Sequence, residues 1–161
     1  MDMYKRILHK LDFVLSSISA ALFFIIFVVI IVEILCRGIL GFSLLWTVEF
    51  SKFLASWMLL IGAAVMFHRN DHLVIDLLTN SLSNKNKRIL AFFTTITTLI
   101  LMIVLFFNGL MSASTMMNMR YTTLGWKMGY SFYALPVFAF FSILFLIEKI
   151  FDLLKEDKVN E

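Results

Sequence analysis

The sequence has few of the residues that a soluble protein needs on its surface. Only 16% of its 161 residues are charged and 61% are hydrophobic, whereas soluble domains carry about 25% charged and about 45–50% apolar residues. The single cysteine, Cys36, allows no internal disulfide and no cysteine-rich metal site. These shortages exclude a disordered chain, a disulfide-bonded secreted scaffold and most soluble enzymes.

Sequence motifs of catalysis are also missing. The chain has no glycine-rich phosphate loop, no H-E-x-x-H pair and no C-x-x-C pair, and no serine stands in a motif with a histidine and an acid. We therefore expect a protein that is not an enzyme and holds no cofactor. The net charge of +3 does not predict nucleic-acid binding, because the basic residues stand at the ends of apolar runs, where they act as topology signals.

The sequence instead contains four long windows without Asp, Glu, Lys or Arg, at residues 13–32, 53–67, 89–119 and 128–147. A membrane-spanning helix needs about 20 apolar residues, and these runs lack the period-two alternation of a β-barrel. We predict an all-α integral membrane protein with four transmembrane helices in a single domain over residues 1–161. The predicted helices cover about 12–36, 45–68, 88–117 and 128–152.

Three of these windows constrain how their helices can cross the bilayer. The second window reaches spanning length only if its helix starts near Leu44 and includes Glu49 and Lys52. The third is longer than a bilayer requires, so its helix must tilt, protrude or break near residues 112–115. The fourth contains the only proline, Pro136, which a membrane helix tolerates when neighbouring groups satisfy the freed carbonyl.

The distribution of Lys and Arg predicts the orientation, because these residues accumulate on the cytoplasmic side. Ten of the 14 lie in the N-terminal segment, the connection 69–88 and the C-terminal segment, and the other four are Arg37, Lys52, Arg120 and Lys127. Both termini should therefore be cytoplasmic. Aromatic side chains favour the membrane boundary, and five fall near the predicted outer one: Trp46, Tyr121, Trp126, Tyr130 and Tyr133.

The connection between the second and third helices is amphipathic. Apolar residues recur at helical spacing, and polar residues, His72 and Asp76 among them, fill the other side. This pattern favours a short interfacial helix over about 71–83 at the cytoplasmic membrane surface, near Arg69. The alternative is an ordinary amphipathic helix packed on protein.

Ionisable residues near membrane helices are functional candidates, because burying a charge is costly. Glu33 and Arg37 are four residues apart in the order that favours a helical ion pair, and Glu49 and Lys52 could also pair. A proton or substrate relay is one interpretation. We favour a structural role, either charge neutralisation at the outer rim or anchoring of a partner, because the central stretches of the third and fourth helices have no ionisable group.

One face of the second helix is the best candidate for contact with protein. Trp46, Glu49, Phe53 and Trp57 share that face, and the indole N–H of Trp57 should bond to another helix. The small residues Gly62 and Ala63 allow close helix packing. Two further pairs of small residues, Gly109 with Ala113 and Gly125 with Gly129, have the spacing of close helix contacts, which often serve packing within one chain.

This helix and the segment after it resemble a known family. The stretch W-T-V-E-F-S-K-F-L-A-S-W at 46–57, then G-A-A at 62–64 and H-R-N-D-H at 68–72, is similar to the DctQ-type small membrane subunit of tripartite ATP-independent periplasmic (TRAP) transporters. The segment S-F-Y-A-L-P at 131–136 resembles the family's ending. The likeness covers nearly the whole chain.

The resemblance implies a scaffold in a bacterial inner membrane. In this family the small subunit binds a much larger membrane subunit, which carries the substrate and sodium sites, and a periplasmic substrate-binding protein delivers an organic acid such as sialic acid or a dicarboxylate. It implies that the large subunit contacts Trp46, Glu49, Phe53, Trp57, Gly62 and Ala63. It also implies that the binding protein docks on Arg37, Arg120 and Lys127, and that Arg69, His72 and Asp76 lie at the cytoplasmic interface.

Three rival functions remain open on the residues alone. A haem-binding membrane anchor subunit of a respiratory complex would use edge histidines, and His68 and His72 lie one helical turn apart. Haem ligands usually come from facing helices, however, so we interpret these histidines as interfacial hydrogen-bonding groups. A small exporter would use a membrane carboxylate such as Glu33. An assembly factor is the third possibility.

Overall fold

The computed structural model describes residues 2–69 and 84–159, and the regular structure in these ranges is helical apart from one isolated β-bridge. The elements are α1 (Asp2–Leu35), the π-helical turn η1 (Cys36–Leu40), α2 (Trp46–Arg69), α4 (Asn84–Met116), α5 (Gly129–Phe132) and α6 (Ala134–Val159). The predicted interfacial helix over 71–83, with His72 and Asp76, lies outside the described residues.

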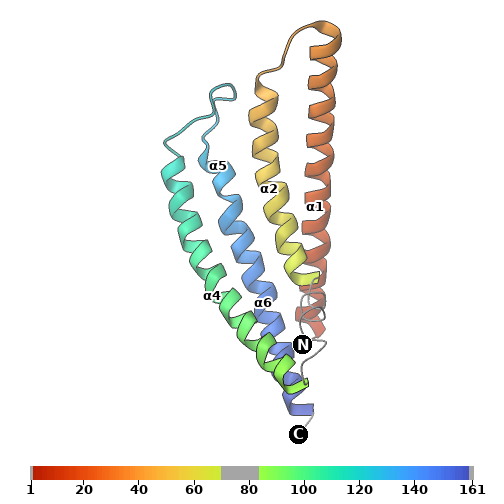
Figure 1. Cartoon of the computed structure of the whole chain (residues 1–161), viewed down its shortest axis with the longest axis vertical. Helices are drawn as coiled ribbons and strands as arrows, with labels where there is room; N and C mark the ends of the chain where they lie inside the picture. The colour runs from red at the N-terminus through yellow and green to blue at the C-terminus, as the bar shows by residue number, and fades with distance from the viewer. Residues whose placement is uncertain (1, 70–83, 160–161) are drawn as a thin grey trace.

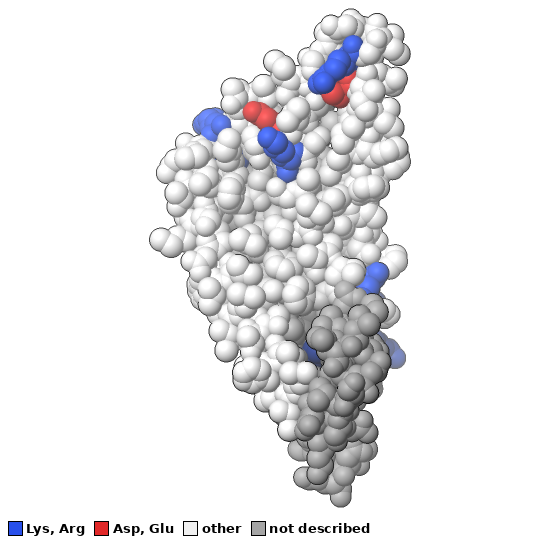
Figure 2. Space-filling view, in the orientation of Figure 1, with Lys and Arg blue, Asp and Glu red and all other residues white. Residues whose placement is uncertain are grey.

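Four of these helices are long and apolar enough to cross a membrane, as the sequence predicts. The candidate spans are Arg6–Leu40, Trp46–Arg69, Ile89–Met116 and Gly129–Ile150. Figure 2 shows one group of charged side chains toward the upper end of the view and a few basic ones in the lower half, beside the residues drawn in grey, with a broad uncharged belt between the two groups. This distribution suits a bilayer, because charges are costly in its hydrocarbon core.

The long helices lie side by side in the order α1, α2, α6, α4 (Figure 1). Helix α1 packs mainly on α2, α2 also packs on α6, and α4 packs mainly on α6 and α5. The start of α1 and the end of α6 lie at one end of the molecule, which we call the terminal end (Figure 1). The opposite end, with the connections 36–45 and 117–128, is the loop end.

Two apolar clusters hold this row together. One contains Leu8 and Leu15 of α1, Ile61 and Val65 of α2, and Phe145 of α6. The other contains Ala64 of α2, Met102 of α4, and Phe138 and Leu146 of α6. Helices α2 and α6 contribute to both clusters, so they form the middle of the molecule and leave α1 and α4 at its edges.

The observed helix ends differ from the predicted ones where polar sequence continues a helix or a proline interrupts it. Helix α1 begins at Asp2, ten residues before the predicted start, and α4 continues without a break through residues 112–115. The predicted fourth helix is divided into α5 and α6 at Tyr133. Pro136 explains that division, because a proline ring clashes with the carbonyl four residues earlier, here that of Phe132.

Candidate functional site

The connection between α4 and α5 forms a tight hairpin at the loop end. The Tyr121 N–H donates to the Trp126 carbonyl at 2.8 Å, and the Met128 N–H donates to the Met119 carbonyl at 3.0 Å. Arg120 and Lys127 face each other as an antiparallel bridge between these bonds. Gly125 has a φ of 67°, which favours glycine and lets four residues close the turn.

A side chain from α2 fills the concave side of this hairpin. The Glu49 carboxylate accepts hydrogen bonds from the backbone N–H groups of Thr122 at 2.9 Å, Thr123 at 2.9 Å and Leu124 at 3.0 Å, and from the Thr123 hydroxyl. Successive N–H groups that converge in a turn form an anion-binding nest. Glu49 therefore fixes the hairpin to α2, and the pairing with Lys52 considered from the sequence does not form.

Aromatic side chains reinforce the junction between α2 and the hairpin. The Trp126 ring lies edge-on to Phe50 at 6.2 Å and to Phe53 at 5.7 Å between centroids, and Trp46 packs on Phe50 at 5.8 Å. Edge-on contacts are a favoured arrangement of aromatic pairs. The hairpin is therefore held on its polar side by Glu49 and on its apolar side by three rings of α2.

Trp57 joins the middle of α2 to α5. Its indole N–H donates to the Tyr130 carbonyl at 3.1 Å, which confirms the prediction that this group bonds to another helix. The Tyr121 hydroxyl and the Ser131 hydroxyl also share a hydrogen bond of 2.6 Å. These bonds connect α2, the hairpin and α5 into one unit.

The connection between η1 and α2 is organised around Glu33, which is 9% exposed. Its carboxylate accepts from Arg37 Nη2 at 2.6 Å, from the Ser43 hydroxyl at 2.6 Å and from the Leu44 N–H at 2.8 Å. The predicted pair of Glu33 and Arg37 is confirmed. Both acidic residues at the loop end thus hold connections in place.

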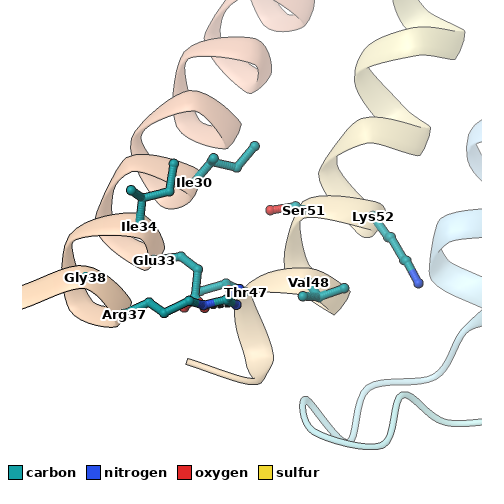
Figure 3. Close-up of a pocket in the computed structure, with 9 residues that line it drawn as sticks. All are labelled: Ile30, Glu33, Ile34, Arg37, Gly38, Thr47, Val48, Ser51 and Lys52. Carbon is teal, nitrogen blue, oxygen red and sulfur yellow. Dashed lines mark hydrogen bonds and ion pairs between the residues drawn. The ribbon is translucent and has the colours of Figure 1, made fainter. Parts of the chain in front are cut away.

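A groove of about 600 Å³ lies beside this network, between α1 and α2. Ile30 and Ile34 form one wall and Val48 part of the other, and the side chain of Lys52 points away from the space between the helices (Figure 3). Arg37 is already paired with Glu33. The groove therefore favours an apolar occupant such as a lipid chain over the carboxylate of an organic acid.

A charged cluster at the terminal end links three helices. Arg69 of α2 donates to Asp12 of α1, with Nη2–Oδ2 at 2.7 Å and Nε–Oδ2 at 3.1 Å, and Asp12 is only 4% exposed. His68 lies between two carboxylates, with Nδ1 3.3 Å from Asp12 Oδ1 and Nε2 3.5 Å from Glu148 Oε2. Because both of its ring nitrogens face carboxylates, His68 is not presented to a haem iron.

Comparison with known proteins identifies the family. Residues 10–156 match the model of the DctQ component of tripartite ATP-independent periplasmic transporters. The chain belongs to the DctQ family. A related protein is the sialic acid TRAP transporter small permease protein SiaQ of Vibrio cholerae serotype O1, with 26% identity over 155 residues that cover 96% of this chain and 88% of that protein.

A second relative of this DctQ chain is far longer. The sialic acid TRAP transporter permease protein SiaT of Haemophilus influenzae is 29% identical over 83 residues. The matched segment is 52% of this chain but 13% of that protein. The Haemophilus protein thus contains a segment similar to about half of this chain, within a polypeptide several times as long.

The small residues of the DctQ chain are used for packing within it. A Cβ atom on Gly62 would lie 3.1 Å from the Ser19 hydroxyl of α1, one on Gly109 would lie 2.9 Å from Pro136 Cδ, and one on Gly129 would lie 2.7 Å from the Ala113 carbonyl oxygen. Ala63 packs against the cluster of α2, α4 and α6. Helix axes can approach closely where side chains are this small.

The six residues predicted to contact a large subunit therefore all have contacts inside the chain. Glu49, Phe53 and Trp57 bind the hairpin and α5, and Gly62 and Ala63 pack on neighbouring helices. Trp46 packs on Phe50 and keeps 40% of its surface exposed. A role for these residues in binding a larger subunit stays a prediction.

Sequence reasoning missed the two polar centres that span distant parts of the chain. A sequence pattern describes side chains, so it does not show which backbone N–H groups converge on Glu49. Asp12 and Glu148 lie in polar segments just outside the uncharged windows, and they looked like ordinary flanking charges. The available signals in the sequence were Gly125 shortly after two threonines, and acidic residues directly beside two of the uncharged windows, at Asp12 and Glu148.

Proposed function

We propose that this chain is the small permease subunit of a sodium-coupled TRAP transporter that imports an organic acid, either sialic acid or a dicarboxylate. The observation that carries the proposal is the family match over residues 10–156, and the similarity to a sialic acid small permease supports the substrate class. The subunit is a scaffold and not the transport path. The acidic residues at the loop end are engaged in holding connections, which favours this structural role.

The partner in the membrane is a large permease subunit. The Haemophilus permease supports this, because 83 residues are 13% of it and it therefore has about 640 residues. The remainder is far larger than this chain. In the Haemophilus protein the similar segment is part of one long permease. Where the segment is a separate chain, as here, we expect it to work beside a separate long permease.

The proposed setting is the bacterial inner membrane, with the terminal end in the cytoplasm. Positive residues concentrate in cytoplasmic segments, and ten of the 14 Lys and Arg residues lie in the segments at that end. The segment 71–83 would lie in the cytoplasmic interface as a helix. Arg69, His72 and Asp76 would then meet the lipid headgroups or the partner there.

The periplasmic binding protein would dock on the hairpin. Arg120 and Lys127 are both exposed and lie opposite each other, and Glu49 holds the turn between them. Arg37 would contribute less to the docking, because Glu33 neutralises it. Exposed charges of this kind mainly accelerate association, and salt screens their effect.

A reconstitution with one component omitted at a time tests the function. We expect import of radiolabelled sialic acid or a C4-dicarboxylate into proteoliposomes only with a sodium gradient, the binding protein, the large permease and this chain. Replacing both Arg120 and Lys127 by Glu should lower uptake and change its salt dependence. Equal transport without this chain, or transport by this chain alone, would contradict the proposal.

A further inference from the structure

The exposed surface of α4 is divided into an apolar arc and a polar arc. The apolar arc holds large side chains such as Phe93, Ile100 and Phe107, with exposed fractions of 58–69%. On a helix with 3.6 residues per turn, six polar residues fall within about 100° of each other, on the arc between that face and the buried face. They are Thr94, Thr97, Thr98, Asn108, Ser112 and Thr115. Ser114 is also exposed but lies on the apolar side, where its hydroxyl donates to the Met111 carbonyl at 2.7 Å.

Most of these polar groups are satisfied on their own helix. The hydroxyls of Thr94, Thr97, Thr98 and Thr115 donate to carbonyls three or four residues earlier at 2.8–3.0 Å. Such bonds let threonine face lipid at small cost. These hydroxyls alone would not require a partner.

Asn108 is different. Its Nδ2 donates one hydrogen bond to the Val104 carbonyl at 2.9 Å, although an amide side chain has two donor hydrogens and an acceptor oxygen with two lone pairs. Within the described residues, its oxygen and its second hydrogen have no partner, and the Ser112 hydroxyl one turn away has none either. The side chain of Asn108 is exposed.

Asn108 lies at a depth where water cannot supply these bonds. It is eight residues from the end of the span Ile89–Met116, which is about 12 Å along the helix, and about 8 Å from the midpoint of the span. The hydrocarbon core extends about 15 Å on either side of its centre. A polar group left unpaired at this depth is costly, so it normally faces protein.

The opposite edge of the molecule provides the comparison. Over residues 20–35 of α1, the exposed side chains are apolar, and Phe23, Phe24 and Phe27 are 54–65% exposed. That surface suits lipid chains. Nearer the terminal end of α1, Ser17 is exposed within the span, but its hydroxyl donates to the Phe13 carbonyl at 2.8 Å. Of the two edge helices (Figure 1), α4 is therefore the one whose described residues include an exposed polar side chain with unpaired groups at membrane depth.

We infer that the polar arc of α4 is the docking surface for a membrane helix of the large permease subunit, which would bond to Asn108 with a polar side chain at the same depth. This inference rests on the proposed function. The occupant follows from polar complementarity, since small polar residues and amides join helices inside membranes. The much longer Haemophilus permease that contains a similar segment supports a large protein over a second copy of this chain.

Site-specific photocrosslinking tests the surface directly. A benzoylphenylalanine at Leu101 lies in the polar arc, and one at Ile100 lies in the apolar arc, at adjacent positions with exposed fractions of 53% and 58%. In cells that contain the large permease of the same organism, we expect the Leu101 probe to crosslink to that permease and the Ile100 probe to give little product. A product at Leu101 with the mass of two copies of this chain would overturn the inference.

Co-purification separates the inference from the function on which it rests. Asn108→Leu should lower recovery of the large permease about three- to tenfold, the loss expected for one interhelical hydrogen bond in a membrane, and Phe107→Leu should not. If the unaltered chain recovers no large permease, the proposed function and this inference both fail. If it does recover the permease but Asn108→Leu is neutral, only the inference fails.

Discussion

At the scale of single residues, the two acidic side chains of the loop end have the same task. Glu33 holds the connection that leads into α2, and Glu49 holds the hairpin between α4 and α5. Glu33 accepts one backbone N–H of its connection and Glu49 accepts three. Unpaired N–H groups are costly near an apolar phase. The charges therefore give the loop end a fixed shape.

Removal of the Glu49 carboxylate should free the hairpin without unfolding the helices. In Glu49→Ala, we expect the amides of Thr122, Thr123 and Leu124 to exchange hydrogen roughly tenfold faster or more, the factor that follows from the loss of a charge-assisted hydrogen bond. Hydrogen exchange in micelles measures this effect. Lys52→Ala, one turn away and outside the nest, is the matched control and should leave the exchange unchanged.

The residue contacts also show which interactions a sequence reveals. Glu33 and Arg37 are four residues apart, so helix geometry alone predicts their contact. Glu49 is 73–75 residues from the N–H groups that it binds, and Asp12 is 57 residues from Arg69. Contacts of this kind depend on which helices become neighbours, and neither charge nor spacing indicates that.

At the scale of elements, the close approach of α4 and α5 sets the position of the hairpin. Gly129 lies against the backbone of α4, where a Cβ atom would meet the Ala113 oxygen at 2.7 Å and Met117 Cγ at 2.9 Å. Met128, the residue before Gly129, ends the hairpin. A shift of α5 would therefore move the hairpin relative to Glu49.

Gly129→Ala should consequently destabilise the chain. We expect a loss of about 1–3 kcal/mol in the free energy of unfolding, the usual cost of forcing an added methyl group into a packed contact. Gly38→Ala is the matched control, because nothing lies within 4 Å of the added Cβ. It should leave the stability unchanged or raise it by up to about 1 kcal/mol, the gain from alanine at an unstrained helical position. Unfolding of both variants in the same detergent compares them, and equal stabilities would contradict this account of the contact.

The elements were more predictable than their boundaries. Apolar length alone identified the four membrane helices, because each window is long enough to cross a bilayer. The start of α1 at Asp2 was missed because Lys5, Arg6 and Lys10 interrupt the apolar run before residue 12. Charged residues end a membrane-spanning window but do not end a helix. The division at Tyr133 follows from Pro136, because a proline disturbs the helical turn that precedes it.

At the scale of the whole molecule, the helices form a row whose edges differ in chemistry. The sequence predicts four apolar helices but not their order, because lipid and protein neighbours both select apolar faces. The order α1, α2, α6, α4 places the polar arc of α4 at one edge and the apolar surface of α1 at the other. An open arrangement of this kind suits a chain that completes its packing against a larger subunit.

The single cysteine allows the orientation of the whole molecule to be tested. Cys36 lies in η1 at the loop end and is half-buried, and Phe42 in the same connection is 50% exposed. If the loop end faces the periplasm, a membrane-impermeant maleimide should label Phe42→Cys, in a Cys36→Ala background, in intact cells. A cysteine added after Glu161 should react only after the cells are permeabilised.

The reverse labelling pattern would place the loop end in the cytoplasm and contradict the proposed topology. It would also remove the hairpin as a docking surface for a periplasmic protein, because the hairpin and the connection that contains Phe42 both lie at the loop end (Figure 1). Ten Lys and Arg residues near the terminal end against four near the loop end favour a cytoplasmic terminal end by the positive-inside rule. We therefore expect labelling of the loop end without permeabilisation.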